Sequence, residues 1–285
     1  MVDMLWFVYA LLAAITGGFI GILNRFILKD HDFISYGFLW NVITSIFFIP
    51  LFLMDFVMPT NFYGWEVTSI GIILWTLIGF IGFKSVQLVE VSTGDSLSQI
   101  QVLFLLFFSS IFLSESLTVN KIVGTFLIFF GLITLTYKKK FFGKITDRGI
   151  QLTIIASLLI ALASIIDKVV LEYWSVPGYS FVAFLFPGLI MGVTSLKRFD
   201  RLIKMVKVRG LSLVVSAILA AVNAYFLFGA YKLTEVSNAY PITRLSTIVA
   251  VLGGIILLKE RESILQKLVG AIIMIIGTIL ISGYL

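Results

Sequence analysis

Residues 86–98 read VQLVEVSTGDSLS, and residues 231–243 read YKLTEVSNAYPIT. The two stretches share Glu-Val-Ser, and Leu-Ser-Glu at 113–115 matches Leu-Lys-Glu at 258–260 at the same spacing. Matches that keep their order over such a distance are hard to obtain by chance, even against a background rich in Leu, Ile and Phe. They indicate that the second half of the chain repeats the first.

Weaker matches extend the repeat toward both ends of each half. A shift of one residue aligns the glycines, and a polar pair near the start of each half aligns as well. We expect the two polar pairs to lie near helix ends and to serve as anchors or in gating salt bridges. The matches are Gly124 with Gly270, Gly131 with Gly277, and Asn24-Arg25 with Asp167-Lys168.

Ten apolar segments of membrane-spanning length follow one another along the chain. Hydrophobic residues make up 60% of the 285 residues, charged residues make up 13%, and the mean hydropathy is +1.09. A soluble domain carries about 25% charged residues. A helix of roughly 20 residues crosses the hydrocarbon core and satisfies its own backbone there. We therefore predict an all-α, polytopic membrane protein with ten transmembrane helices. The segments are 4–28, 33–58, 66–89, 92–113, 119–137, 150–172, 178–196, 210–233, 237–258 and 264–284.

The repeat and the number of segments together predict how the two halves are oriented. Each half holds five segments, and a unit with an odd number of crossings must be upside down relative to its copy. We expect two inverted five-helix repeats, residues 1–145 and 146–285. Many secondary transporters use this architecture for alternating access around a site between the repeats.

Each half also carries a longer pattern. Residues 92–133 read STGDSLSQIQVLFLLFFSSIFLSESLTVNKIVGTFLIFFGLI, and residues 237–280 read SNAYPITRLSTIVAVLGGIILLKERESILQKLVGAIIMIIGTIL. Both have a polar helix start, an apolar run that ends in Glu, and a helix with Gly seven residues apart. In this layout the chain resembles the EamA-type branch of the drug/metabolite transporter (DMT) superfamily. The resemblance implies ten spans in two five-helix halves and export or exchange of small metabolites, such as amino acids, nucleotide precursors, sugars or amphiphilic drugs.

The chain departs from the family pattern at two points. Val102 and Thr247 occupy the positions, thirteen residues before the Glu, where the family usually has Pro. Lys and Arg concentrate in the loops that follow odd-numbered segments, mainly 138–148 and 197–209, so the positive-inside rule places these loops in the cytoplasm and both termini outside the cell membrane. Most relatives have both termini in the cytoplasm, which is the opposite orientation.

Arg244 is the clearest candidate for solute binding, because an ionisable group inside a span is costly and is by default a functional candidate. Its counterpart in the first repeat is Gln99, and the pair Asp95 and Tyr240 lies one turn earlier. A guanidinium binds a carboxylate or phosphate through two bonds. A structural Arg paired with a carboxylate or with backbone carbonyls is the alternative. Asp95 either couples transport to protons or caps its helix after 92–94.

Three further polar side chains inside the predicted spans are weaker candidates for the substrate-binding site. Asn223 either lines the pathway or hydrogen-bonds to a neighbouring helix. Trp40 and Asn41, in the second segment, are candidates of the same kind. We expect the segments 119–137 and 264–284, which are nearly free of polar residues, at the periphery against lipid or a second copy of the chain, as in a homodimer.

Composition argues against several other functions. The chain has no Cys, and His31 is its single histidine, so no metal site, cofactor or catalytic residue is predicted. The net charge of +6 is explained by anchoring at the membrane rather than by nucleic acid. We predict a secondary transporter for an amino acid or a similar small solute, not an enzyme. A lipid-related flippase or an accessory scaffold is the alternative, and an intramembrane enzyme is the least favoured.

Overall fold

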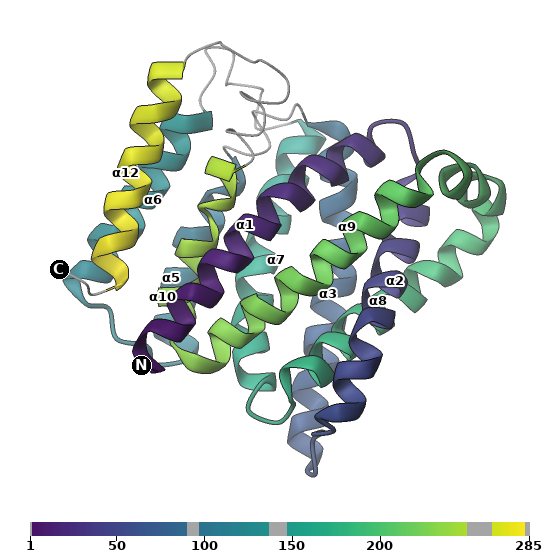
Figure 1. Ribbon diagram of the computed structural model, residues 1–285, viewed down its shortest axis with the longest axis horizontal. Helices are drawn as coiled ribbons and strands as arrows, with labels where there is room; N and C mark the ends of the chain where they lie inside the picture. The colour runs from purple at the N-terminus through teal and green to yellow at the C-terminus, as the bar shows by residue number, and fades with distance from the viewer. Residues whose placement is uncertain (1, 90–96, 137–146, 250–263, 283–285) are drawn as a thin grey trace.

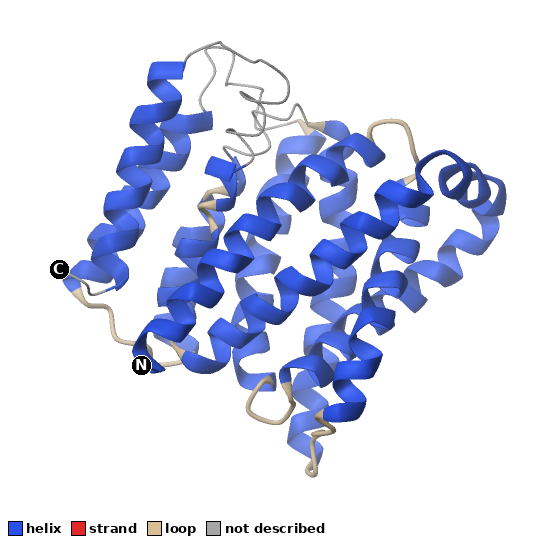
Figure 2. Cartoon of the chain, in the orientation of Figure 1, coloured by secondary structure: helices blue, strands red, loops and turns tan. Residues whose placement is uncertain are grey.

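The computed structural model describes residues 2–89, 97–136, 147–249 and 264–282, and this part of the chain contains helices and no strands (Figures 1 and 2). The all-α prediction is therefore confirmed. The helices are α1 (Val2–Leu28), α2 (Phe33–Met54), α3 (Phe62–Leu88), α5 (Ile100–Phe112), α6 (Val119–Thr136), α7 (Arg148–Val170), α8 (Val176–Ser195), η1 (Leu196–Arg198), α9 (Phe199–Leu233), α10 (Val236–Thr243) and α12 (Ile264–Ser282).

Polar residues between the apolar segments cap the N-termini of several helices. The Asp32 carboxylate accepts a hydrogen bond from the N–H of Ser35 at 3.0 Å and caps α2, and the Asn61 side chain caps α3 by accepting one from Gly64 at 2.8 Å. Ser175 caps α8 in the same way. Each cap satisfies an N–H group that a helix start leaves without a partner. These polar side chains therefore fix where α2, α3 and α8 begin.

The helices agree in length with a multi-pass membrane protein. Among the described residues, six helical stretches are long and apolar enough to cross a membrane, one of which contains both α8 and α9, and α5 and α6 are shorter apolar helices. The basic run 197–209 differs from the loop that we predicted, because α9 already begins at Phe199 and is 35 residues long. Apolar residues recur among its Lys and Arg residues, so this stretch is an amphipathic continuation of the helix.

Helices at equivalent positions in the two halves form reciprocal contacts. The first helix of the first half, α1, packs on the third helix of the second half, α9, and α3 packs on α7 in return. The second helices, α2 and α8, pack on each other, as do α6 and α12. Figure 1 shows α6 and α12 together at one edge, which agrees with the peripheral position that we expected for the segments 119–137 and 264–284.

Paired equivalent helices run antiparallel. Along α6 and α12, Gly124 lies against the backbone of Gly277, whereas Gly131 lies against that of Gly270. The order along one helix is thus reversed along the other, and α2 and α8 show the same reversal. Glycine at these four positions lets the two backbones approach closely, as small residues do between membrane helices.

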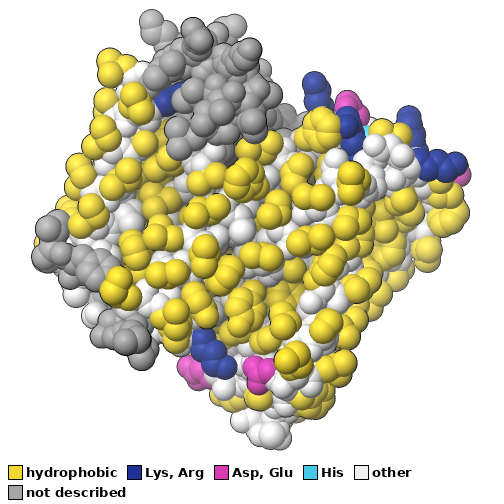
Figure 3. Space-filling view, viewed as in Figure 1, with side chains coloured by type: hydrophobic (Ala, Val, Ile, Leu, Met, Phe, Trp, Pro, Cys, Tyr) yellow, Lys and Arg dark blue, Asp and Glu magenta, His cyan; other side chains and the backbone are white. Residues whose placement is uncertain are grey.

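The outer surface matches a membrane environment. Large apolar side chains cover the helices between two charged edges, while the visible Lys, Arg, Asp and Glu residues lie mainly along two opposite edges (Figure 3). Leu211 is 81% exposed and Val119 is 74% exposed. An apolar surface of this extent on a soluble monomer would be unusual. Lipid covers it in a multi-pass protein.

At one charged edge, Asp32 joins the N-terminus of α2 to the start of α9. Its carboxylate lies 2.5 Å from the guanidinium of Arg198 and 3.3 Å from that of Arg201. Burial alone would raise the pKa of Asp32, but the hydrogen bond from Ser35 and the interaction with Arg198 together hold it below its ordinary value. The carboxylate therefore stabilises the folded protein when it is ionised.

We expect Asp32→Asn to lower the melting temperature of the detergent-purified protein at neutral pH by a few degrees, which corresponds to about 1 kcal/mol. The pKa of Asp32 is lower in the folded than in the unfolded chain, so this stabilisation is complete above about pH 4 and is lost as the pH falls through the folded pKa. Melting curves as a function of pH should show the two proteins converging in acid. The exposed neighbour supplies the control, Asp30→Asn, and equal losses in both variants would contradict the assignment.

Candidate functional site

A cavity of about 450 Å³ lies between helices of both halves. This volume suits a small organic molecule, since ligand pockets typically occupy about 300–1,000 Å³. Along α7 the cavity runs from Thr153, near the end that follows the basic segment 138–148, to Ser164. The lining residues are Ala13, Gly17, Trp75, Gly82, Ser85, Val86, Val89, Ser98, Gln101, Thr153, Ala156, Ser157, Ile160, Ser164, Asn223, Leu227, Tyr240, Thr243, Arg244 and Ser246.

The fourth helix of each half is interrupted at the same position. Gln99 lies in a turn between residues 97–98 and α5, and its repeat counterpart Arg244 lies in a turn directly after α10. At each turn a backbone N–H donates to the carbonyl three residues earlier, as in a 3₁₀ helix. The N–H of Val102 donates to the carbonyl of Gln99 at 3.1 Å, and the N–H of Thr247 donates to that of Arg244 at 3.0 Å. Interrupted helices inside a membrane are tolerated where the backbone lines a cavity, and they often mark the substrate site of a transporter.

Arg244 brings a positive charge to the cavity wall and is held there by Tyr240. The guanidinium lies over the Tyr240 ring, 4.6 Å from its centroid, and Nη2 donates to the Tyr240 hydroxyl. These residues are one turn apart, so the i, i+4 relation expected from sequence is present in the structure. The stacked ring fixes the direction of the guanidinium at the cavity wall.

Neutral polar side chains of α3, α7 and α9 form another part of the cavity wall. Ser85 and Thr153 lie within hydrogen-bond distance of each other across α3 and α7, with 2.6 Å between the two hydroxyl oxygens. Asn223 donates to the carbonyl of Ala13 at 2.6 Å and to the Thr16 hydroxyl at 3.2 Å, so it both lines the cavity and joins α9 to α1. The hydrogen bond to a neighbouring helix is thus present, and a role for Asn223 in the transport pathway stays a prediction.

The structure brings some of the predicted site residues together and leaves others apart. Arg244, Tyr240 and Asn223 line one cavity, and Gln99 is buried next to the lining residue Ser98. Asp95 lies outside the described residues.

Trp40 and Asn41 belong to a separate region, on α2. The indole N–H of Trp40 donates to the Ser216 hydroxyl at 3.1 Å, and the Asn41 side-chain amide donates to the Gly37 carbonyl at 2.7 Å. Neither residue lines the cavity.

Several lining residues were missed by sequence reasoning. Small hydroxyl residues on α7 recur at helical spacing, so Thr153, Ser157 and Ser164 share one face with Ile160. That periodicity is visible in the sequence and could have predicted a polar wall. Trp75 also lines the cavity, and nothing in the local sequence of α3 distinguishes it from other aromatic residues.

The end of the bundle at which α7 ends is closed by charged groups from both halves. Glu115, in the loop after α5, accepts hydrogen bonds from the backbone N–H groups of Val236 at 2.7 Å and Ser237 at 2.9 Å, at the start of α10. The Lys121 amine pairs with Glu235 and donates to the Ser237 hydroxyl at 3.1 Å. Glu115 therefore caps a helix of the other half.

Comparison with known proteins agrees with this geometry. The model of the EamA-like transporter family matches residues 4–137 and, a second time, residues 147–283. The chain belongs to the EamA-like transporter family. The two matches confirm the resemblance and the two-repeat organisation, and the family is one of transporters rather than enzymes.

A solved structure described as "Crystal structure of protein" shares the fold of this EamA-like chain. The TM-score is 0.74 and the sequence identity is 13%, over 95% of this chain and 95% of the other. Identity at this level supports the fold alone. A comparison with curated proteins finds no match. Substrate and direction of transport therefore rest on the cavity itself.

Proposed function

We propose that this EamA-like protein is a secondary transporter that moves a small metabolite, such as an amino acid, across the cell membrane by alternating access. The moving parts are two inverted five-helix repeats, residues 1–145 and 146–285, with ten spans in all. The single observation that carries the proposal is the cavity between the halves, with Arg244 at a helix interruption on its wall. The reciprocal, antiparallel packing of equivalent helices supports the inverted arrangement.

The lining of the cavity narrows the chemistry of the solute. Among the described lining residues Arg244 carries the only formal charge, and the remaining polar groups are hydroxyls, amides and the Trp75 indole. A single carboxylate on the solute would complement this charge, and neutral polar groups on the solute would meet the Ser, Thr and Asn side chains. An amino acid or a related small carboxylate fits this set and the cavity volume.

The extent of the cavity also indicates the side of the membrane from which a solute can reach it. The cavity extends along α7 toward the end at which this helix begins, whereas Glu115, Lys121 and Glu235 close the opposite end. If the basic loops are cytoplasmic, as the positive-inside rule predicts, the accessible side of the cavity is the cytoplasmic one and both termini are outside. We infer an inward-facing form on this basis. Export or exchange begins from such a form.

Solute counterflow tests the proposed function. Purified protein in liposomes is loaded with an unlabelled mixture of the common amino acids, and uptake of the same labelled amino acids is followed against protein-free liposomes. We expect transient accumulation above equilibrium. Absence of counterflow with amino acids and with small monocarboxylates would contradict the proposal and favour a scaffold role.

A reporter fused after Leu285 tests the orientation. We expect alkaline phosphatase, which folds only outside the cytoplasm, to be active at this position, and a cytoplasmic fluorescent reporter to be dark. Fusion within 138–148 should give the reverse pattern. Fluorescence at the C-terminus with inactive phosphatase would place both termini inside, as in most relatives.

A further inference from the structure

Asp167, near the end of α7, is a carboxylic acid buried among neutral groups. It has no exposed surface, and one oxygen, Oδ1, accepts hydrogen bonds from the Tyr179 hydroxyl and from the Trp75 indole N–H at 3.0 Å. The other oxygen, Oδ2, is buried with no hydrogen-bond partner in the described part of the chain. We expected Asp167 and Lys168 to form end-of-helix anchors or gating salt bridges. Asp167 joins α7 to α3 and α8 through hydrogen bonds, and no ion pair to it occurs among the described residues.

The charged and titratable groups around Asp167 do not neutralise it. Lys168, next to it on α7, turns away and donates to the carbonyls of Tyr231 at 2.5 Å and Thr234 at 2.9 Å. From α9 the neutral hydroxyl of Tyr231 donates to the Ser164 hydroxyl, with 3.4 Å between the two oxygens.

From α8 and α3 the facing groups are Tyr179 and Trp75, both neutral. Arg244, beyond α10, stacks on Tyr240, and Glu115 binds the start of α10. An ionised carboxylate in this position would be costly, because a buried charge without a cation loses its hydration and gains no ion pair.

The other half of the chain contains the same arrangement with an amide in place of the acid. Asn24, the repeat counterpart of Asp167, accepts hydrogen bonds through its side-chain oxygen from the Tyr36 hydroxyl and from the Ser216 hydroxyl at 2.9 Å. In each half the acceptor lies on the first helix, a Tyr donates from the second helix, and the third helix of the opposite half supplies another donor. The same framework therefore holds a permanently neutral side chain at Asn24 and a titratable one at Asp167.

Asp167 also lies between the inner end of the cavity and the closed end of the bundle. Ser164, one turn earlier on the same face of α7, lines the inner end of the cavity, and Trp75 both lines the cavity and contacts the carboxyl. Beyond Asp167 come the Lys168 amine and the closed end of the bundle. A small movement of Trp75 would open the carboxyl to the cavity, whereas opening of the closed end would expose it to the other side.

We propose that Asp167 is a proton-binding site that takes up one proton and releases one proton in each transport cycle. The proposal rests on the proposed transport function. The carboxylate combines with H⁺ from water on one side of the membrane to give the neutral acid, and the acid returns H⁺ to water on the other side. The acid fits the buried site seen here, and the carboxylate requires contact with water, so movement of the proton is tied to the change of the accessible side.

Infrared difference spectroscopy of the full-length protein in detergent tests the site, and it requires no solute. Titration upward from about pH 5.5, where exposed carboxyls are already ionised, should remove one carboxylic C=O band per chain from the wild-type spectrum. Asp167→Asn should lack this band, and Asp167→Glu should retain it at a shifted frequency, which keeps the test valid if the Asn variant does not fold. The exposed Asp55→Asn is the control and should keep the wild-type band.

The outcomes separate this inference from the transport proposal. A titrating band that persists unchanged in Asp167→Asn, or a wild-type protein without such a band, overturns the proton site. A band that disappears only in Asp167→Asn supports it. Counterflow by the wild-type protein is measured independently, so a failure of transport with an intact titration would overturn the proposed function but not the proton-binding property of Asp167.

Discussion

Arg244→Ala should lower the rate of amino acid counterflow by about 100-fold at a given solute concentration. The substitution removes two charge-assisted hydrogen bonds to the solute carboxylate, which together contribute about 3 kcal/mol, and tenfold in binding corresponds to about 1.4 kcal/mol. Tyr240 and the helix interruption remain in place, so expression and melting temperature should change little. Counterflow in liposomes with matched protein content measures the effect.

Two further variants make the Arg244 experiment specific. Arg244→Lys keeps the charge but loses the planar pair of donors, so its activity should lie between that of the wild type and that of the Ala variant. Lys204→Ala removes an exposed positive charge of α9 and should leave counterflow unchanged. Wild-type rates in Arg244→Ala would assign the guanidinium a purely structural role.

Glu115→Ala should produce the largest loss of stability among single substitutions at the closed end. The variant leaves the N–H groups of Val236 and Ser237 without their acceptor in a buried position, and each such group costs about 1–3 kcal/mol. The negative charge that favours the N-terminus of α10 is lost as well. We expect the melting temperature in detergent to fall by about 5–15 °C.

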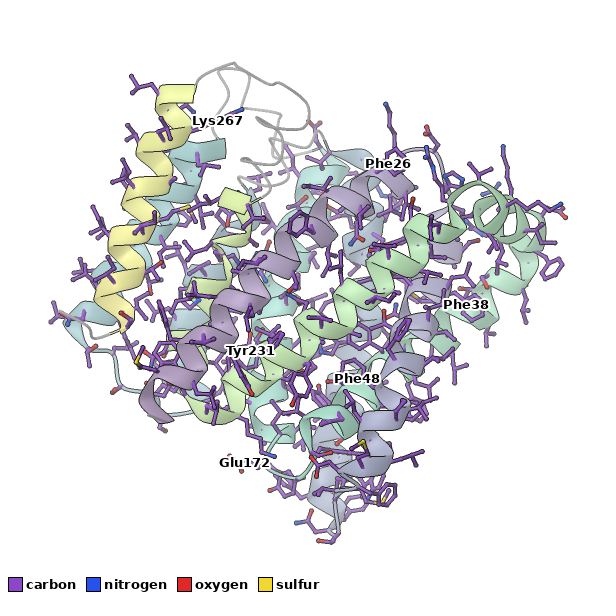
Figure 4. The ribbon with its side chains drawn as sticks, viewed as in Figure 1. Phe26, Phe38, Phe48, Glu172, Tyr231 and Lys267 are labelled. Carbon is purple, nitrogen blue, oxygen red and sulfur yellow. The ribbon has the colours of Figure 1, made fainter. Side chains whose placement is uncertain are left out.

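The control for Glu115 comes from the same end of the bundle. Glu172 is exposed and lies at the lower edge of the molecule (Figure 4), and Glu172→Ala should shift the melting temperature by less than about 2 °C. Glu115→Gln retains one acceptor oxygen and should be intermediate. Equal melting temperatures for Glu115→Ala and the wild type would show that water replaces the carboxylate, and that the two halves do not depend on this contact.

Much of the fold could be predicted because it depends on local patterns in the sequence. Apolar length predicted the helices, and the Glu-Val-Ser repeat predicted the two halves that the family matches confirm. The spacing of Tyr240 and Arg244 predicted that they share one helix face, since side chains four residues apart are neighbours on a helix. The number of ten spans and the outward termini stay predictions. So does the role of each site residue.

Other features depend on contacts between distant segments. The Trp75 indole meets the Asp167 carboxyl across 92 positions of the chain, and no local pattern indicates that pairing. Asp167 looked like an anchor because Lys168 follows it and the helix ends shortly afterwards. Its burial results from the packing of α3 and α8 on α7. The start of α9 was missed for a different reason, because its basic residues obscured a helical periodicity that continues into the membrane.

The unequal pair formed by Asn24 and Asp167 has a consequence for stoichiometry. A transporter assembled from two identical subunits would carry the same acid in both copies and could load two equivalent protons. In this chain the copies are joined in one polypeptide, so one copy could change its acid to an amide, or the reverse, without altering the other. With Asp167 as the proposed proton-binding site, the fused arrangement would limit the exchange to a single proton per turnover at this pair of positions. A pH gradient would then drive solute accumulation with a first-power rather than a squared dependence on proton activity.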